Sequence, residues 1–153
     1  MIALIAVPSG FAGGALAAQQ QQRLDDAFPD VAPSIADGSA QRDLDAARAR
    51  WRESGPRSYT YRGRLGCYCT VESVKPHTFV VRNRKPRHPP KGAKRFATAW
   101  RLFKLVQGAI DDKVDGLVVH YRRNGLLKEL DVDRDSMAAD DEYSYFVDRF
   151  SSP

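Results

Sequence analysis

The chain has 153 residues, of which 42% are hydrophobic and 28% are charged, and its formal net charge is +5. This length supports one hydrophobic core without help from a metal or a disulfide framework, and the composition excludes a wholly disordered protein. The two cysteines are too few for a closed zinc site.

Residues 1–17 resemble a signal peptide. The segment is uncharged and apolar, and Ala15-Leu16-Ala17 has the small-x-small pattern that signal peptidase reads. It is short for a transmembrane span and is interrupted by glycine and proline. No Lys or Arg precedes the apolar run, so a membrane anchor and a buried helix stay open as alternatives. The pattern predicts export, to the periplasm or the exterior.

Residues 18–39 are predicted to be a flexible linker, and residues 40–153 a single domain. Pro29, Pro33 and Gly38 interrupt any regular pattern in the linker. From Ser39, a plausible N-cap, apolar residues recur at helical spacing. This stripe consists of Ala40, Leu44, Ala47 and Trp51, before Gly55-Pro56 ends the helix. Trp51 is therefore expected to be a core residue.

A strand is predicted over residues 57–66, where Tyr59 and Tyr61 share one face and Arg62 and Arg64 the other. The apolar run from Thr78 to Arg82 predicts a second strand. Between Arg82 and Ala97 three prolines remove backbone donors, which predicts an exposed loop. A second helix follows Thr98. Its predicted buried stripe is Ala99, Leu102, Phe103, Val106 and Ile110.

Asn124-Gly125 predicts a tight hairpin with a two-residue type I′ turn. Counting outward pairs Tyr121 with Lys128, Val119 with Leu130 and Leu117 with Val132, and this set faces the core. The other face pairs His120 with Glu129, which favours a surface role for His120. A last strand is predicted over Tyr143–Phe150. The expected fold is α+β, in the order α-β-β-α-β-β-β, with an antiparallel sheet of four to five strands and two helices packed on one face.

Several short motifs coincide along the chain. They are Trp51 before Gly55-Pro56, Ser58-Tyr59-Thr60-Tyr61, Cys67-Tyr68-Cys69, Phe96-Ala97-Thr98 with Leu102-Phe103, and Asp140-Asp141-Glu142 before Tyr145. Together they resemble a family of exported bacterial proteins classified only as a domain of unknown function. The resemblance runs from about Ala46 to the C-terminus. It implies export, a small α+β domain and no established activity.

Cys67 and Cys69 are candidates for a disulfide, because thiols outside the cytosol tend to be oxidised. A continuing strand would hold their Cα atoms about 6.5–7 Å apart, so a bend is needed to join them. One interpretation is a local staple. The alternative is a reducible disulfide for thiol exchange, although no helix start that would activate a thiolate is evident after the cysteines.

Four acidic residues fall at positions 1, 3, 5 and 12 of a calcium-loop pattern: Asp131, Asp133, Asp135 and Glu142. Ser136 stands where that loop normally has glycine, so calcium is only one interpretation. The other is a solvated acidic turn. No cofactor is otherwise predicted.

Basic residues dominate the middle of the chain. From Ser73 to Ile110 there are ten Lys or Arg residues and no acid, whereas Asp111 to Asp148 holds eleven acids and five bases. The candidate anion-binding residues are Arg82, Arg84, Lys85, Arg87, Lys91, Lys94 and Arg95. This polarity favours an anionic cell-envelope component or an acidic protein as partner. Without a recognition helix or stacking motif, no specific nucleic-acid target is expected.

No nucleophile elbow, phosphate loop or zinc-protease motif can be recognised by spacing. The preferred hypothesis is an exported, non-enzymatic binding module. The alternatives are a thiol–disulfide exchange protein and a calcium-stabilised structural domain.

Overall fold

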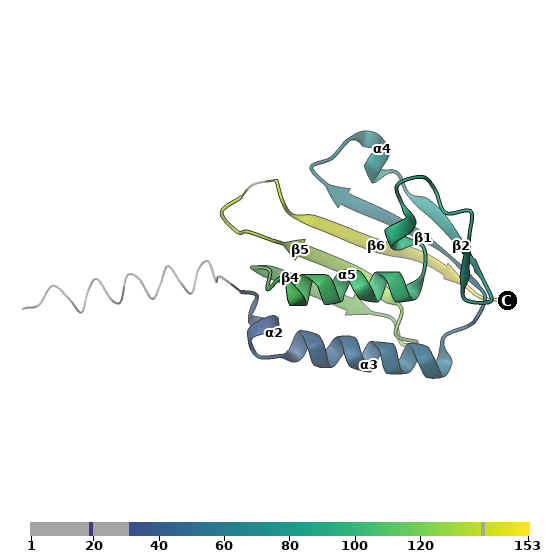
Figure 1. Ribbon diagram of the computed structural model, residues 1–153, viewed down its shortest axis with the longest axis horizontal. Helices are drawn as coiled ribbons and strands as arrows, with labels where there is room; N and C mark the ends of the chain where they lie inside the picture. Colours follow the sequence, from purple (N-terminus) through teal and green to yellow (C-terminus); the bar gives the residue numbers. More distant parts are fainter. Residues whose placement is uncertain (1–18, 20–30, 139) are drawn as a thin grey trace, which may run out of the picture.

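The computed structural model describes residue 19, residues 31–138 and residues 140–153. Six antiparallel strands form one sheet in the order β3-β2-β1-β6-β5-β4. The helices α3 and α5 lie side by side on one face of this sheet (Figure 1). The predicted α+β architecture is confirmed, with one strand more than expected. The predicted signal peptide lies outside the described residues, and no helix within them has the length and apolar character needed to cross a bilayer.

Packed structure begins inside the segment that was predicted to be a linker. Residues Pro33–Ala36 form the one-turn helix α2. Ala32 is 1% exposed, and its backbone N–H donates a hydrogen bond of 2.8 Å to the carbonyl of Val114. Residues before position 40 therefore already pack against the domain. Proline and glycine prevent a long helix here but permit a single turn that packs against the domain.

Helix α3 (Ser39–Ser54) buries the four residues predicted from spacing, Ala40, Leu44, Ala47 and Trp51. Its N-cap is Gly38, one residue before the predicted position. The Trp51 ring lies 5.2 Å from the ring of Tyr59, in an edge-to-face arrangement. Trp51 is thus a core residue, as predicted.

Helix α5 (Ala99–Asp111) begins after Thr98, whose hydroxyl accepts a hydrogen bond from the backbone N–H of Arg101 at 3.3 Å. This is the predicted N-cap. The buried stripe matches the prediction except near its end, where Ala109 is buried and Ile110 is half-buried.

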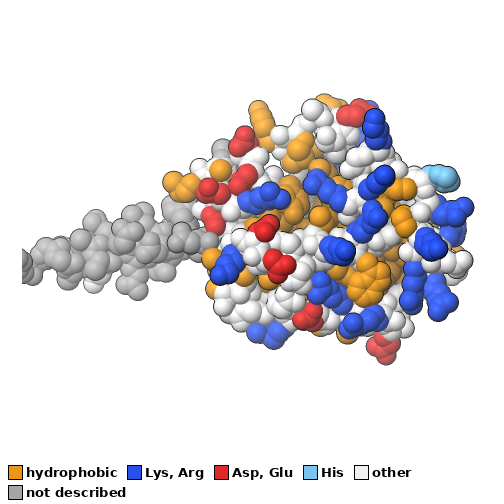
Figure 2. Space-filling view, in the orientation of Figure 1, with side chains coloured by type: hydrophobic (Ala, Val, Ile, Leu, Met, Phe, Trp, Pro, Cys, Tyr) orange, Lys and Arg blue, Asp and Glu red, His pale blue; other side chains and the backbone are white. Residues whose placement is uncertain are grey.

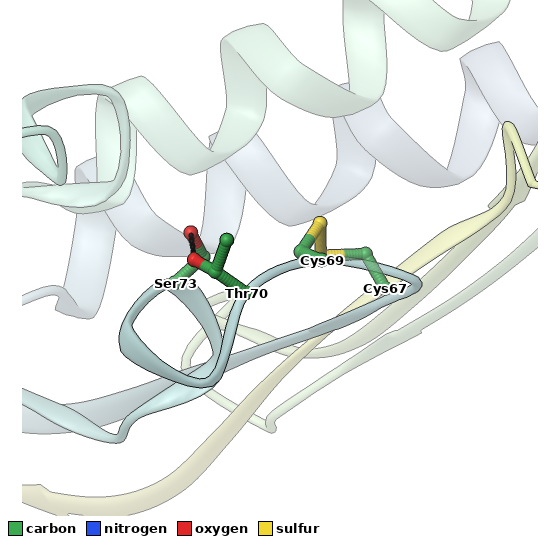
Figure 3. The surroundings of a disulfide bond; sticks show 4 residues. All are labelled: Cys67, Cys69, Thr70 and Ser73. Atoms are coloured by element: carbon green, nitrogen blue, oxygen red, sulfur yellow. Dashed lines mark hydrogen bonds between the residues drawn. A yellow bond between two sulfur atoms is a disulfide. The ribbon is translucent and has the colours of Figure 1, made fainter.

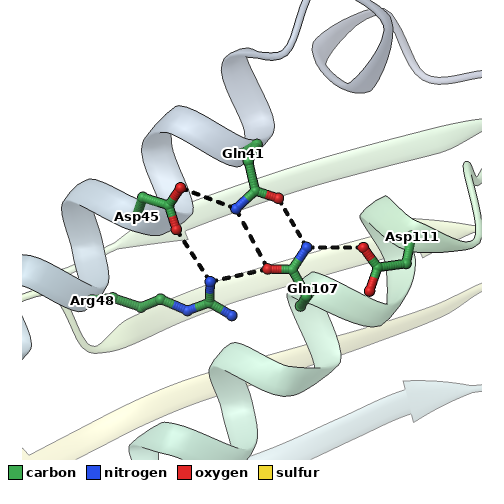
Figure 4. A network of polar contacts seen from close by, with 5 residues as sticks. All are labelled: Gln41, Asp45, Arg48, Gln107 and Asp111. Carbon is green, nitrogen blue, oxygen red and sulfur yellow. Dashed lines mark hydrogen bonds and ion pairs between the residues drawn. The ribbon is translucent and has the colours of Figure 1, made fainter.

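A polar network ties the exposed sides of the two helices together (Figure 4). The Gln107 amide of α5 donates to Gln41 of α3 at 2.8 Å and accepts from Arg48 of α3 at 2.9 Å. Gln107 also donates to Asp111 on its own helix at 3.0 Å. Because hydrogen bonds are directional, this network sets how the helices lie relative to each other above their apolar contacts.

The strands β1 (Tyr59–Cys67) and β6 (Tyr143–Ser151) form the middle of the sheet. Tyr59, Tyr61 and Leu65 of β1 point to the buried face, because alternate residues of a strand share a face. Strand β2 (His77–Arg82) pairs with the other side of β1 and buries Phe79 and Val81.

Strand β3 (Lys85–Arg87) falls in the segment that was predicted to be a loop. It pairs with β2 at one edge of the sheet. Pro86 is tolerated because an edge strand needs backbone donors on one side only. The rest of the predicted loop, apart from a 3-10 turn at Lys94–Phe96 (η1), contains no strand or helix among these described residues.

The hairpin of β4 (Gly116–Tyr121) and β5 (Leu127–Asp133) has the predicted register from Leu117↔Val132 to His120↔Glu129. A bulge then pairs Tyr121 with Leu127, not Lys128. The predicted turn type is also wrong. The Gly125 N–H donates to the Arg122 carbonyl, and only Gly125 of the Asn-Gly pair has positive φ, at 88°. This is a three-residue turn with a glycine bulge.

Candidate anion-binding site

A glycine on β1 and a tyrosine on β6 share one space on the buried face of the sheet. Gly63 pairs with Val147 of β6, and the hydroxyl of the nearby Tyr145 lies where a Cβ at residue 63 would stand. Tyr145 is 1% exposed, and its hydroxyl has no hydrogen-bond partner within the described residues. Burial raises the pKa of the Tyr145 hydroxyl far above its usual range, so this group stays a neutral donor.

Phe96 is stacked on Tyr145, and Arg95 lies over Phe96. The Phe96 ring lies parallel to the Tyr145 ring, with 4.3 Å between centroids. On Phe96 lies the guanidinium of Arg95, with its carbon 4.7 Å from the ring centroid. A cation on an aromatic face is attracted by the ring quadrupole. The stack therefore holds an exposed positive charge close to a buried phenol.

These residues line a pocket of about 230 Å³ between η1, β1, β2 and the short helix α4 (Val71–Val74). Lys91, Arg95 and His77 supply its basic side chains. The apolar lining comes from Leu65, Phe79 and Phe96. Gly63 and Tyr145 also line it, and the remaining lining residues are Glu72, Ser73, Gly92 and Ala93. We call this space the Tyr145 pocket.

The seven predicted anion-binding residues all lie on the protein surface. We call this set the basic edge: Arg82, Arg84, Lys85, Arg87, Lys91, Lys94 and Arg95. It runs from β2 through the edge strand β3 to η1. None of the seven forms an ion pair with any residue that the structure describes. Figure 2 shows that most Lys and Arg side chains on the helix-covered face lie toward the right half, on the side of β2, and most acids lie toward the left.

Cys67 and Cys69 lie at disulfide distance, with 2.01 Å between the sulfur atoms. Strand β1 ends at Cys67, and the Cys69 N–H donates to the Cys67 carbonyl at 2.8 Å. This tight turn brings the Cα atoms to 5.2 Å, closer than a continuing strand allows. Figure 3 shows the pair at the bend between β1 and α4.

The expectation that no helix start follows the cysteines is wrong, because α4 begins at Val71. It is a single turn of four residues, and Glu72 lies within it. A helix this short has a small dipole, and a nearby carboxylate opposes thiolate formation. The geometry thus supplies little activation for thiol exchange.

The four acids of the calcium prediction lie at the end of β5 and in the segment before β6. Asp131 and Asp133 share the sheet face that is opposite the helices, because Leu130 and Val132 face the core. Burial, together with the charge of Glu129, raises the pKa of Asp131. Within the described ranges no group of three or more His, Cys, Asp or Glu side chains is arranged to hold a metal ion.

Sequence patterns do not indicate the Tyr145 pocket, although two of its lining residues, Lys91 and Arg95, belong to the predicted anion-binding set. The missing information is the pairing of β1 with β6, which places Gly63 beside Tyr145 across a long stretch of sequence. A glycine inside an otherwise regular strand is the one signal that could have suggested a close approach.

The comparisons with known proteins add a family but no activity. No curated protein and no solved structure matches the chain. A family model described as a family of unknown function, DUF6174, matches residues 43–152. This range contains both central strands, the cysteine pair and the whole basic edge. The chain belongs to DUF6174.

Proposed function

We propose that this protein is an exported, non-enzymatic domain that binds an anionic component of the cell envelope through its basic edge. The observation that carries the proposal is the arrangement of seven exposed bases without an ion-pair partner among the described residues. Export is supported by the signal-like pattern of residues 1–17.

The charge distribution favours an external partner over internal pairing. The protein has acids available, but they are concentrated after Ile110 in the sequence and on β5, two strands away from β1. Separated charges of this kind create a field outside the molecule, and that field attracts and steers anions. Exposed side chains without internal partners can bind an anion without first breaking an ion pair.

Vesicles provide the direct test. The full chain is mixed with vesicles of phosphatidylglycerol and phosphatidylcholine at low and high salt, and the bound fraction is measured by sedimentation. Binding is expected to need the anionic lipid and to weaken strongly as salt rises. Binding that is unchanged at high salt would contradict the proposal. If polyglutamate binds but the vesicles do not, the partner is an acidic polypeptide, and the assignment to an anionic envelope surface is wrong.

A pair of triple variants makes the test specific. Arg84→Gln, Lys85→Gln and Arg87→Gln together remove three charges from the basic edge. The control, Arg50→Gln, Arg123→Gln and Lys128→Gln, removes three exposed charges elsewhere. Each base near an anionic surface contributes about 1 kcal/mol, so removing three of them should weaken vesicle binding by on the order of a hundredfold. Equal effects of the two variants would show that net charge alone is responsible.

A further inference from the structure

We propose that the Tyr145 pocket binds a small organic carboxylate whose apolar part lies among Leu65, Phe79 and Phe96. This inference deepens the proposed function, because two of the pocket's charges, Lys91 and Arg95, belong to the basic edge. It adds a concave site and a ligand class to what is otherwise a charged surface.

The side chains that can donate hydrogen bonds to an anion come from separate elements. His77 is on β2, Lys91 is in the loop after β3, and Arg95 is on η1. Arg95 is held over the Phe96 ring, so less side-chain freedom is lost when its N–H groups donate to a carboxylate. Convergence of such groups on one apolar pocket is typical of small-molecule sites.

The Tyr145 hydroxyl is the second, independent observation. A buried hydroxyl without a partner is unfavourable, because the hydrogen bond it made to water in the unfolded chain is lost. Within the described residues this group has no acceptor, although it stands among the residues that line the pocket. Because the hydroxyl oxygen is closed to solvent, a carboxylate oxygen would accept its hydrogen bond only once the lining side chains shift on binding.

The pocket's size and lining restrict the ligand. A volume of about 230 Å³ corresponds to on the order of eight water-sized groups. This space suits a single ring or a short branched chain. Aromatic and aliphatic side chains then remove the apolar part of the ligand from water.

One acidic residue, Glu72, also lines the pocket. Its carboxylate forms an ion pair of 2.7 Å with Lys75 on the same short segment. Lys75 reduces the repulsion that Glu72 would exert on an anionic ligand. The net field in the pocket is therefore positive, because Lys91 and Arg95 have no such partner among the described residues.

Benzoate is the probe for this site. It is titrated into the full chain while amide chemical shifts are recorded by NMR, and the expected result is saturable shifts around Gly63, Phe79 and Phe96. Acetate has the charge without the ring, and benzyl alcohol has the ring without the charge. Both should bind at least tenfold more weakly. Equal binding of benzyl alcohol would overturn the role of the cations, and no saturable shifts with benzoate would overturn the site.

Tyr145→Phe removes only the unpartnered hydroxyl and keeps the ring that stacks on Phe96. It should weaken benzoate about tenfold, the effect of losing a hydrogen bond to a charged group, without lowering the melting temperature. The matched control is Tyr121→Phe, because Tyr121 also has a buried hydroxyl without a partner among the described residues but does not line the pocket. It should leave benzoate affinity unchanged. Unchanged affinity in Tyr145→Phe would contradict the proposal.

The failure of this site and the failure of the basic edge can be told apart. Lys85→Gln lies outside the pocket and should weaken vesicle binding but not benzoate binding. Vesicle binding in a protein that does not bind benzoate would overturn the pocket assignment alone. If the protein binds benzoate but not vesicles, only the proposed envelope partner is wrong.

Discussion

The hydroxyl of Tyr145 on β6 occupies the space that a side chain at Gly63 on β1 would need. Tyr145 thus sets the residue type on the neighbouring strand. The contact bears on stability through packing. It also bears on the proposed ligand site, because the same hydroxyl lacks a partner among the described residues and lies beside a basic pocket.

Gly63→Ala should destabilise the fold by about 1–3 kcal/mol, because the added methyl group overlaps Tyr145 in a packed interior. Chemical denaturation measures the loss. The double variant with Tyr145→Phe should recover part of it, since one of the overlapping atoms is gone. Gly108→Ala is the control. A Cβ there meets no atom within 4 Å in the middle of α5, and the change should stabilise the protein by about 0.5–1 kcal/mol.

Tyr59→Phe should cost about 1–2 kcal/mol. The Tyr59 hydroxyl accepts a hydrogen bond of 2.9 Å from the backbone N–H of Ala99, at the start of α5, and both groups are buried. Without that oxygen the N–H loses its acceptor. Tyr121→Phe removes a hydroxyl with no partner among the described residues and should be nearly neutral. Urea denaturation measures the free energy of unfolding of both variants. An equal decrease in Tyr59→Phe and Tyr121→Phe would show that the Tyr59–Ala99 hydrogen bond is not the cause.

The Arg62–Asp148 ion pair should make stability depend on acid pH. The hydrogen-bonded guanidinium of Arg62, 2.6 Å from Asp148, holds the pKa of that carboxyl below its usual range. Because the pKa of Asp148 is lower in the folded state, the ion pair contributes fully to stability above the ordinary carboxyl pKa. This contribution to stability is lost as the pH falls through the lower folded-state pKa of Asp148. Because the pair is exposed, solvent and salt screen it and its contribution to stability is small.

Asp148→Asn tests this pH dependence. The variant should melt slightly below the wild type at pH 7, and the difference should disappear near pH 2. A difference that stays constant over this range would exclude the ion pair as its cause.

Reduction of the Cys67–Cys69 pair should leave the fold intact. The loop between the cysteines is very short, so the entropic stabilisation is only about 1.5 kcal/mol. The pair also lies at the end of β1, outside the buried core. Circular dichroism with and without dithiothreitol should show the same secondary structure and a slightly lower melting temperature. Unfolding on reduction would show that the pair is needed for folding.

Local sequence patterns predicted the helices and strands in which buried residues recur at a regular spacing. The stripes of α3 and α5 follow from spacing alone, because each helix has a single buried side. The hairpin register was also predictable up to His120. The turn itself was not, because Gly125 packs closely against the backbone of Ala47 in α3, a contact that no local pattern contains.

Features that depend on distant pairing could not be predicted. Strand β3 exists because β2 offers an edge, although Pro86 alone indicates a loop. The basic edge was visible as composition, but its pocket required β6 to bring Tyr145 beside Gly63 and η1 to place Arg95 above it. The charged residues of the candidate site could therefore be predicted from the sequence, whereas its pocket depends on the sheet topology.

The division of charge across the sheet has a directional consequence. The bases accompany β2 and β3 at one side, whereas Glu129, Asp131 and Asp133 accompany β5 near the other. A negatively charged surface would both attract and rotate such a molecule. Such a field favours approach with β3 leading and the β4–β5 hairpin trailing, so orientation is biased before any contact forms.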